Sequence, residues 1–331
     1  MSDTKQIVRI DASSLKQSSC GRRLFLDIVK GYRGSRDSND LVYGSAFHKC
    51  VETYAHSKDE PLAHAAAMKY WSDAEPTMAV KDTAKYLNAG HLSLCCQKFF
   101  DAMKKDSIFT ECSPIVIDGE TLVEKKFSIP IYSNDTLDIL LQGTIDGLYQ
   151  IAKGCANIGD WKTTRSYNPI DYFYEYKLSV QLRTYLWAVK WMMSKNPDSP
   201  IAKALSGAPK IGCFIYGAFL SSKETVKFMR SEVFQFSEQD LAEYESMLMD
   251  VVRKLVVDIN VFNSHGVYPQ PQGIINSTCK SYGKPCKYFG ACSSHIGVQG
   301  IDPKTSFQAM LDNHFVQKEY KPLTFGGGKV E

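Results

Sequence analysis

The stretch GTIDGLYQIAKGCANIGDWKTT, residues 143–164, is the most informative part of the chain, because it is predicted to form two adjacent strands of a β-hairpin. Side chains alternate between the two faces of a strand, so Asp160 and Lys162 point the same way while Trp161 points into the packing layer. A second carboxylate, Asp146, lies on the preceding strand. One face of the hairpin therefore offers an anion and a cation side by side.

The length of the turn determines whether the two carboxylates meet. A three-residue connection over 152–154 would place Asp146 opposite Asp160, whereas a two-residue turn at Lys153-Gly154 would place Asp146 opposite Trp161. Opposed side chains lie roughly 4.5 to 5.5 Å apart, and like charges at that distance need a cation between them. The first register favours a bridging divalent ion, and the alternative is a pair of carboxylates that face solvent.

The charge of the chain excludes a uniformly basic surface. The net charge is +3 over 331 residues, so any contact with nucleic acid would come from local patches. One patch lies near the start of the chain and another surrounds the hairpin, and each of these residues can equally belong to an ordinary solvated face. The two patches comprise Arg22, Arg23, Lys30, Arg33 and Arg36, and Lys125, Lys126, Lys162 and Arg165.

The sequence predicts a soluble, cytoplasmic protein with no membrane partner. No apolar run approaches the roughly 18 residues that span a bilayer, and the polar start MSDTKQ lacks the layout of a secretory signal. In a reducing compartment the ten cysteines would either be buried or bind metal.

The pattern of apolar residues predicts a mixed α/β fold. The expected helices cover 13–30, 42–56, 62–71, 82–105 and 168–193, with a further one begun by Ser237, and the expected strands lie between 109 and 163 and over 210–220 and 226–236. The tail after Pro269 is expected to be loop-like, with FGGGKVE mobile at its end. We expect one domain over 1–331, made of a helical region over 1–105, a catalytic sheet core over 106–236, a C-terminal helix and cysteine clasp over 237–300, and a tail over 301–331. The GGGKV segment lacks the spacing of a nucleotide-binding loop, which argues against a built-in ATP motor.

Two predicted helices carry polar residues on apolar faces. His48 shares a face with Leu41, Gly44 and Val51, so it is either a satisfied core histidine or a metal ligand. Glu52, one turn later, could orient the imidazole or be a plain surface charge.

Three more polar residues allow two interpretations each. Gln181 and Tyr185 lie one turn apart beside Leu182, and a glutamine on an apolar stripe needs a hydrogen bond, either to a strand end or within a catalytic site. Glu124, in LVEKKF, is either part of a cross-strand ion pair or an active-site carboxylate.

Together these motifs, in the order GxxxH, an isolated Glu, GxxD, DxK and QxxxY, resemble the PD-(D/E)XK nuclease superfamily, specifically its RecB-type exonuclease branch. The resemblance implies a restriction-endonuclease-like core with a central mixed sheet flanked by helices. It also implies a metal site with the supporting residues Gln181 and Tyr185. The implied ligands of Mg²⁺ or Mn²⁺ are His48, Asp146, Asp160 and the carbonyl of Trp161, and the implied catalytic groups are Lys162, Asp160, Asp146, Glu124, Gln181 and Tyr185.

The residue types agree with that chemistry. Oxygen ligands with one imidazole suit Mg²⁺ or Mn²⁺ better than a closed zinc site. The metal would polarise a phosphodiester and lower the pKa of water, while Lys162 positions that water or stabilises the developing negative charge.

The cysteines at the two ends of the chain extend the resemblance. Cys279, Cys286 and Cys292 lie in STCKSYGKPCKYFGAC, and the iron-sulfur members of this branch, such as the CRISPR-associated and AddB exonucleases, place a fourth ligand before the histidine helix, here Cys20. Four thiolates suit a [4Fe-4S] cluster or, alternatively, a structural Zn²⁺, and His295 could substitute for one ligand. The loop closed by this clasp would be worth roughly 4 to 5 kcal/mol in the analogous disulfide. The other six cysteines, Cys50, Cys95, Cys96, Cys112, Cys155 and Cys213, are expected to be packing residues.

The clasp would also gather groups that contact DNA. The expected contacts to the DNA backbone are Arg22, Arg23, Lys280, Lys284 and Lys287, and the side chains expected to stack on unpaired bases are Tyr282, Tyr288 and Phe289.

The function expected from these features is that of a metal-dependent deoxyribonuclease, an exonuclease on single strands or ends in replication, recombination or repair. A separate helicase or recombination protein would be its partner. The alternative is a DNA-end-binding accessory module with the same fold and little cleavage.

Overall fold

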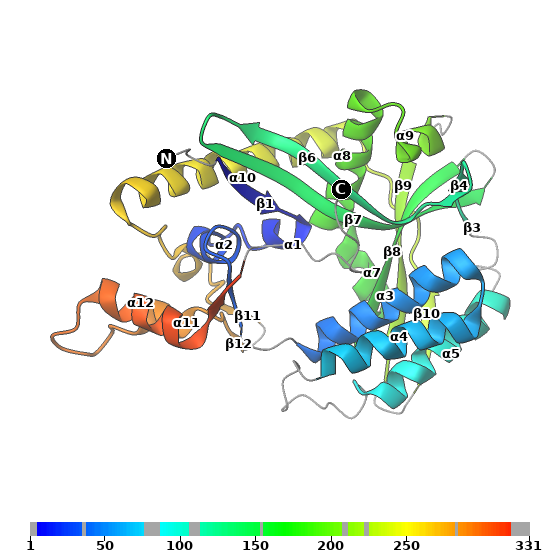
Figure 1. Ribbon diagram of the computed structural model, residues 1–331, viewed down its shortest axis with the longest axis horizontal. Coiled ribbons are helices and arrows are strands. Elements are labelled where there is room, and N and C mark those ends of the chain that lie inside the picture. The colour runs from blue at the N-terminus through cyan, green and yellow to red at the C-terminus, as the bar shows by residue number, and fades with distance from the viewer. Residues whose placement is uncertain are drawn as a thin grey trace. The chain divides into compact units, whose positions relative to one another are not determined.

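The computed structural model describes residues 5–34, 38–75, 87–105, 113–152, 155–206, 211–221, 225–281 and 284–318 (Figure 1). The chain divides into two compact units. Unit 1 comprises Met1–Ser35, Ser128–Gln142 and Glu243–Pro322, and unit 2 comprises Arg36–Phe127, Gly143–Ala242 and Leu323–Glu331.

A mixed sheet forms the framework, which confirms the predicted α/β class. Its strand order is β1-β7-β8-β9-β10, and β3 and β6 also pair with β7. β7 pairs in parallel with β1 and antiparallel with β8, while β9 pairs in parallel with β8 and antiparallel with β10. The strands are β1 (Gln6–Ile10), β3 (Ser113–Pro114), β6 (Val123–Ser133), β7 (Leu137–Ala152), β8 (Cys155–Thr164), β9 (Ile211–Leu220) and β10 (Val226–Arg230), with short pairs β2 (Tyr32–Arg33) and β13 (Val316–Gln317), β4 (Val116–Ile117) and β5 (Glu120–Thr121), and β11 (Lys280–Ser281) and β12 (Lys284–Pro285).

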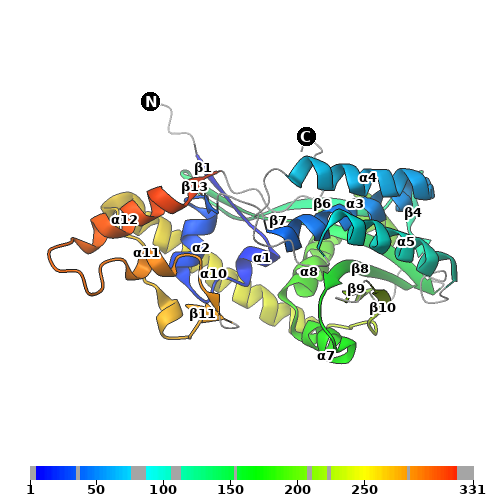
Figure 2. The same ribbon diagram turned by 90° about the horizontal axis from the view of Figure 1, so that it is seen from below.

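In unit 2, a layer of three helices covers one face of β8, β9 and β10. These are α3 (Asn39–Ser57), α4 (Glu60–Ala74) and α5 (Ala89–Lys105), which lie side by side in Figures 1 and 2. Of these, α3 and α5 lie against the strands, and α4 lies against both helices. Their shared core is strongly aromatic, and it includes Phe47, Phe99, Trp161, Phe214 and Tyr216. The Trp161 ring stacks on Tyr216 with centroids 4.3 Å apart, as expected for a side chain that points into the packing layer.

The opposite face of the strands meets α8 (Val180–Lys195), beside which α9 (Pro200–Leu205) packs. The Cys213 thiol lies 3.9 Å from the Leu182 carbonyl oxygen, and the Phe127 ring packs edge-on against Tyr185. The two faces of β8 therefore present different side chains to α3–α5 and to α8, as the alternation in a strand requires.

Glycines permit a close aromatic approach on the hairpin of β7 and β8. A Cβ on Gly147 or Gly159 would lie within 2.7 Å of the Tyr149 ring. The Tyr149 hydroxyl in turn accepts a hydrogen bond of 3.0 Å from the Trp161 indole nitrogen. These contacts fix the orientation of β8 at the residues next to Trp161.

Two predicted helices are interrupted. The stretch 13–30 forms α1 (Ala12–Leu15) and α2 (Gly21–Ile28), because Cys20 has extended backbone angles. The stretch 168–193 forms α7 (Pro169–Tyr174), the 3₁₀ helix η3 (Glu175–Leu178) and then α8, because Ser179 is extended and its hydroxyl caps α8 by accepting from the Leu182 N–H. At Ser179 local capping outweighs continued periodicity, whereas Cys20 makes no side-chain capping hydrogen bond.

Unit 1 contains more regular structure than expected. The strand β1 was not predicted, and the tail after Pro269 is not loop-like throughout, because η4 (Gln272–Ile274), α11 (Phe289–Ser293) and α12 (Pro303–His314) form there beside α10 (Glu238–His265). A small core holds them, with Leu26, Tyr32, Tyr288, Phe307 and Leu311 among its members. The FGGGKVE segment lies outside the described residues. None of the described helices has the length and apolar character needed to cross a membrane.

Candidate active site

The register of the β7–β8 hairpin places the two predicted carboxylates on neighbouring strands. Gly147 pairs with Gly159, and continuing this register by one residue would set Asp146 opposite Asp160. The turn itself pairs Ala152 with Cys155, which alone would give the other register, but an irregularity between Gln150 and Ala152 shifts the strands by one residue. A β-bulge therefore brings the two acids together.

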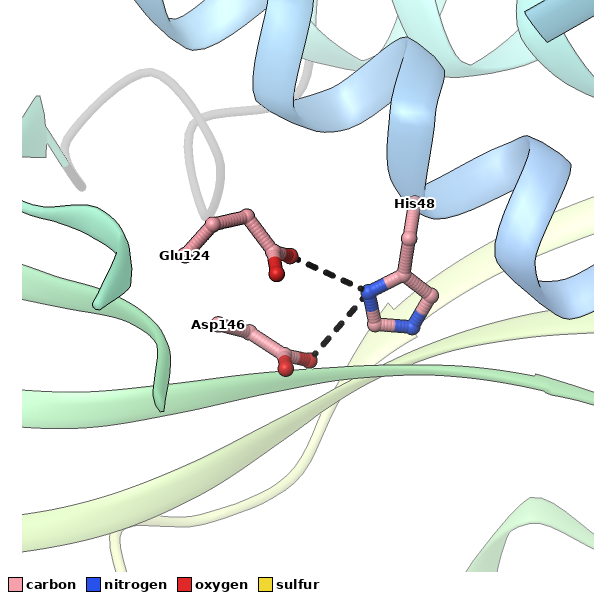
Figure 3. Close-up of side chains that lie close together, drawn as sticks. All are labelled: His48, Glu124 and Asp146. Atoms are coloured by element: carbon pink, nitrogen blue, oxygen red, sulfur yellow. Dashed lines mark ion pairs between the residues drawn. The ribbon is translucent and has the colours of Figure 1, made fainter. Parts of the chain in front are cut away.

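Asp146 of this pair also belongs to a group of three side chains, each from a different element (Figure 3). The His48 Nδ1 of α3 lies 3.5 Å from both Glu124 Oε1 of β6 and Asp146 Oδ2 of β7. Among the described residues, these three form a group of possible metal ligands whose ligand atoms all lie within 4.8 Å of one another. Each of the three side chains is at most 7 % exposed.

The backbone of Trp161 orients two members of the group. Its carbonyl oxygen accepts a hydrogen bond of 2.9 Å from His48 Nε2, and its N–H donates to Asp146 Oδ2 at 2.7 Å. A carbonyl can only accept, so the proton of the neutral imidazole must be on Nε2. The lone pair of Nδ1 then faces two carboxylates, an arrangement that only a proton or a cation between them makes favourable.

Glu124 shows two further signs of a ligand site. Its backbone has a φ of 50°, in the left-handed region that costs energy for a non-glycine residue. Its Oε2 atom is buried and has no hydrogen-bond partner among the described residues. A bound cation would satisfy that oxygen, so the residues present fit a divalent metal.

A second chain of contacts extends from Asp160 toward α8. Lys162 Nζ lies 2.7 Å from Asp160 Oδ1 and 2.6 Å from Oδ2, and Gln181 Nε2 donates to Oδ1 at 3.1 Å. Gln181 Nε2 also lies 2.7 Å from the Tyr185 hydroxyl. Gln181, which also contacts Tyr185, thus supports the Asp160 carboxylate, and Asp160 in turn binds Lys162.

Burial and charge perturb every ionisable group of the site. Burial raises the pKa of Asp160 to about 6, against the opposing effect of Lys162, and burial likewise raises the pKa of Asp146 and of Glu124. For His48, burial lowers the pKa, but Asp146 and Glu124 outweigh it and raise the pKa to about 9. Asp146, Asp160 and Glu124 share the site with Lys162, and the raised pKa of His48 indicates that the site favours an additional positive charge at its imidazole.

The comparison with known families agrees with this arrangement. The profile described as the PD-(D/E)XK nuclease superfamily matches residues 12–292. The chain belongs to this superfamily. Nucleases of the PD-(D/E)XK type use divalent metals, in line with the His48, Glu124 and Asp146 group.

Two solved structures are similar to much of the chain at low sequence identity. An exonuclease candidate from Eubacterium rectale is 12 % identical, with a TM-score of 0.44, and the match covers 88 % of this chain and 94 % of that chain. The protein named SSO0001 is 13 % identical, with a TM-score of 0.24, and the match covers 72 % of this chain and 84 % of that chain. No curated protein matches the chain.

Some predicted details of this PD-(D/E)XK site differ in the structure. Leu41 is 55 % exposed, so it does not share the buried face of His48. Glu52 pairs with Lys49 at 2.8 Å, which makes it a member of an ion pair on its own helix. The sequence allowed two interpretations of Glu124, and in the structure its Oε1 atom lies 3.5 Å from His48 Nδ1.

The four predicted cluster cysteines belong to unit 1. Cys20 is buried at the start of α2, and the other three are partly buried. Cys286 N–H donates to the Cys279 carbonyl at 2.7 Å. Burial, and then the charges of Cys20 and Cys286, raise the pKa of Cys279, and the same causes, opposed by Arg22, raise that of Cys292. Among the described residues, the thiols do not form a compact group of ligand atoms like that of His48, Glu124 and Asp146.

Outside this group, four cysteines predicted to be packing residues are indeed buried, namely Cys50, Cys95, Cys96 and Cys213. Cys112 and the side chain of Cys155 lie outside the described residues.

The structure describes the side chains of four of the five predicted DNA-binding cations. Arg22 Nε donates to the Pro269 carbonyl at 2.7 Å, and Arg23 is half-buried. Lys287 Nζ lies 2.5 Å from Asp27. The side chain of Lys284 lies outside the described residues, and Lys280 is exposed.

The prediction that Tyr288 stacks on bases is wrong. Tyr288 is 1 % exposed, and its hydroxyl donates to Asp27 at 2.7 Å, so its ring cannot stack on bases. It packs in the core of unit 1 because its hydroxyl finds a buried acceptor there. Phe289 is 48 % exposed, and Tyr282 lies outside the described residues.

Proposed function

We propose that the protein is a metal-dependent deoxyribonuclease of the RecB-type branch, an exonuclease on single strands or DNA ends in replication, recombination or repair. The observation that carries this proposal is the orientation of His48. Its Nδ1 atom faces Glu124 and Asp146 while its Nε2 is committed to Trp161, beside the Lys162 ammonium. That arrangement can bind a cation and also places the Lys162 ammonium where it can stabilise negative charge that develops on a phosphate.

Each residue has a distinct role in this proposal. His48, Glu124 and Asp146 would hold Mg²⁺ or Mn²⁺, with Asp160 as the adjoining carboxylate. Relative to the ligands that the resemblance implies, Glu124 takes the place of the Trp161 carbonyl, which accepts from His48 Nε2. When bound, such an ion supplies positive charge to the phosphodiester oxygens and lowers the pKa of water. Lys162 would hold the attacking water or the phosphate oxygen that gains charge.

Asp160 and α8 support the lysine. Asp160 fixes the Lys162 ammonium at 2.6 to 2.7 Å, and the two carboxylates Asp160 and Asp146 raise the pKa of the ammonium against the effect of burial, so it stays charged. Gln181 and Tyr185 keep Asp160 in place. A charged, oriented donor costs no reorganisation during the reaction, which is the basis of its catalytic effect.

The cysteines would bind a [4Fe-4S] cluster that joins the two ends of the chain. Burial and the nearby Cys20 and Cys286 raise the pKa values of Cys279 and Cys292, which lie up to 272 positions from Cys20 in the sequence, and all four are free cysteines. The alternative occupant is Zn²⁺, which anaerobic purification followed by iron, sulfide and zinc analysis would distinguish.

The test of the catalytic proposal compares the parent with Lys162→Ala on single-stranded DNA labelled at the 5′ or 3′ end, in Mn²⁺. We expect release of short products from one end by the parent and at least about a hundredfold slower cleavage by the variant. Lys98→Ala, which removes an exposed lysine of α5 that belongs to neither basic patch, is the matched control and should cleave normally. Equal rates for Lys162→Ala and parent would favour the DNA-end-binding alternative, and cleavage of circular single strands would exclude a strict exonuclease.

A further inference from the structure

The segment between β8 and α8 carries an apolar stripe on its surface. Tyr167, Ile170, Tyr174 and Leu178 are 91 %, 78 %, 68 % and 80 % exposed. Tyr167 precedes the N-cap of α7, Ile170 and Tyr174 lie one turn apart on α7, and Leu178 ends η3. Four large apolar side chains in twelve residues form a surface that is unusual for a face in contact with water alone.

The other side of the same segment is firmly packed. The rings of Tyr172 and Phe173 lie against Phe219, at 5.4 and 5.6 Å between centroids. The hydroxyls of Tyr172 and Tyr176 are 2.9 Å apart and hydrogen-bonded. Asn168 caps α7 by accepting from the Ile170 N–H. The stripe is therefore presented by an anchored element.

The anchored side of the segment lies next to the catalytic lysine. Lys162 pairs with Gly217 on β9, and a Cβ built on Gly217 would lie 3.3 Å from the Phe173 ring. Burial raises the pKa of Tyr172 and Tyr176, and the charge of Asp160 contributes to both shifts. The segment thus forms one border of the site that would hold the scissile phosphodiester.

The charges of the segment do not favour phosphate binding. Arg165 pairs with Asp40 at 3.0 Å, and Lys177 pairs with Glu232 at 3.0 Å while it lies 5.0 Å above the Tyr174 ring. Two acids, Asp171 and Glu175, balance the two cations. What this surface offers is ring and side-chain faces, which suit nucleobases whose own faces are exposed.

We infer that Tyr167 and Tyr174, with Ile170 and Leu178 between and beyond them, form a stacking surface for unpaired bases of the strand that enters the active site. This inference rests on the proposed deoxyribonuclease function. It assigns the preference for single strands to specific side chains, because bases in a duplex already stack on their neighbours and cannot offer both faces.

The test is a binding measurement that needs no turnover. Full-length parent and the Tyr167→Ala/Tyr174→Ala variant are titrated in EDTA with a labelled oligothymidylate, with the corresponding duplex, and with an abasic strand of the same length. We expect the variant to bind the single strand at least about fivefold more weakly for each ring removed, and the duplex and abasic strand as the parent does. The slope of log affinity against log salt should not change, because no phosphate contact is lost.

Two matched variants separate stacking from a general effect. Tyr167→Phe/Tyr174→Phe keeps both rings and should bind like the parent. Leu62→Ala removes another exposed side chain, 53 % exposed on α4, and should also bind like the parent. All substituted residues are exposed, so equal thermal unfolding midpoints are expected.

The inference is overturned if the double alanine variant binds the single strand as tightly as the parent, the outcome expected if a protein partner covers the stripe. An equal loss of affinity for the abasic strand or the duplex would also overturn it. A parent that fails to cleave DNA while showing the expected binding difference would refute the proposed catalysis and leave the stacking surface standing.

Discussion

Protons and a divalent metal compete for one atom, His48 Nδ1, so metal affinity should depend steeply on pH. The pKa of His48 is raised from 6.5 to about 9. Nδ1 can bind a metal ion only when it carries no proton. At pH 6.5 this competition lowers the apparent affinity for Mn²⁺ by a factor of about 300 relative to its limit above pH 9, which corresponds to about 3 kcal/mol.

Calorimetric titration with Mn²⁺ between pH 6.5 and 9.5 measures this effect. Affinity should rise about tenfold per pH unit and level off above the His48 pKa of about 9. Titrations near pH 7.5 in buffers of different ionisation enthalpy should count about one proton released per metal bound. His56→Ala, which removes an exposed imidazole of the same helix, should leave the profile unchanged.

Glu124→Gln tests why the pKa of His48 is raised. It removes one of the two carboxylates that raise the pKa of His48, so the Mn²⁺ affinity should level off at a lower pH. The maximum affinity should also be lower, because an oxygen ligand is lost. Metal binding that is independent of pH between 6.5 and 9, or that releases no proton, would refute the reasoning about Nδ1.

The same pKa gives a stability prediction with a defined sign. A group whose pKa is raised on folding contributes stability that is present below its unfolded value and is lost as the pH rises through the folded value. For His48 that window runs from pH 6.5 to about 9. The metal-free protein should therefore unfold at lower temperature at pH 9 than at pH 6.5, and Mn²⁺ should reverse the loss at pH 9.

Three further predictions concern the supports of the site and of the clasp. Gln181→Ala should lower cleavage about tenfold or more and reduce the free energy of unfolding by about 1.5 to 3 kcal/mol, because a hydrogen bond to a charged buried group is lost, as urea denaturation can show. Trp161→Ala should cost about 3 to 5 kcal/mol, since the ring is 2 % exposed and stacked in the core, which the same denaturation measures. Cys20→Ser should abolish stoichiometric iron in anaerobically purified protein and lower the thermal midpoint, measured by metal analysis and calorimetry.

Each of these predictions has an outcome that contradicts it. Unchanged cleavage by Gln181→Ala would mean that Asp160 needs no support from α8. A loss below about 1 kcal/mol for Trp161→Ala would show that the hairpin is not anchored by that ring. Parent and Cys20→Ser preparations with the same iron content would remove Cys20 from the ligand set, and Cys213→Ser, at a buried packing thiol, is the matched control.

The amino-acid sequence alone determined the local features of the site. Alternation along β8 separates Asp160 and Lys162 from Trp161, and helical spacing places Gln181 one turn before Tyr185. Both are properties of neighbouring residues, because the periods of a strand and a helix are set by the backbone. For the same reason the α/β class and most of the helices of unit 2 were predictable, with errors at their ends.

Only the tertiary structure decided which groups meet. The bulge before Ala152 selects the register that brings Asp146 to Asp160, and the fold places Glu124 Oε1 3.5 Å from His48 Nδ1. Likewise, Tyr288 is buried because Asp27, far away in the sequence, accepts its hydrogen bond. These outcomes depend on packing and hydrogen bonding between distant segments, for which the periodicity of one segment carries no information.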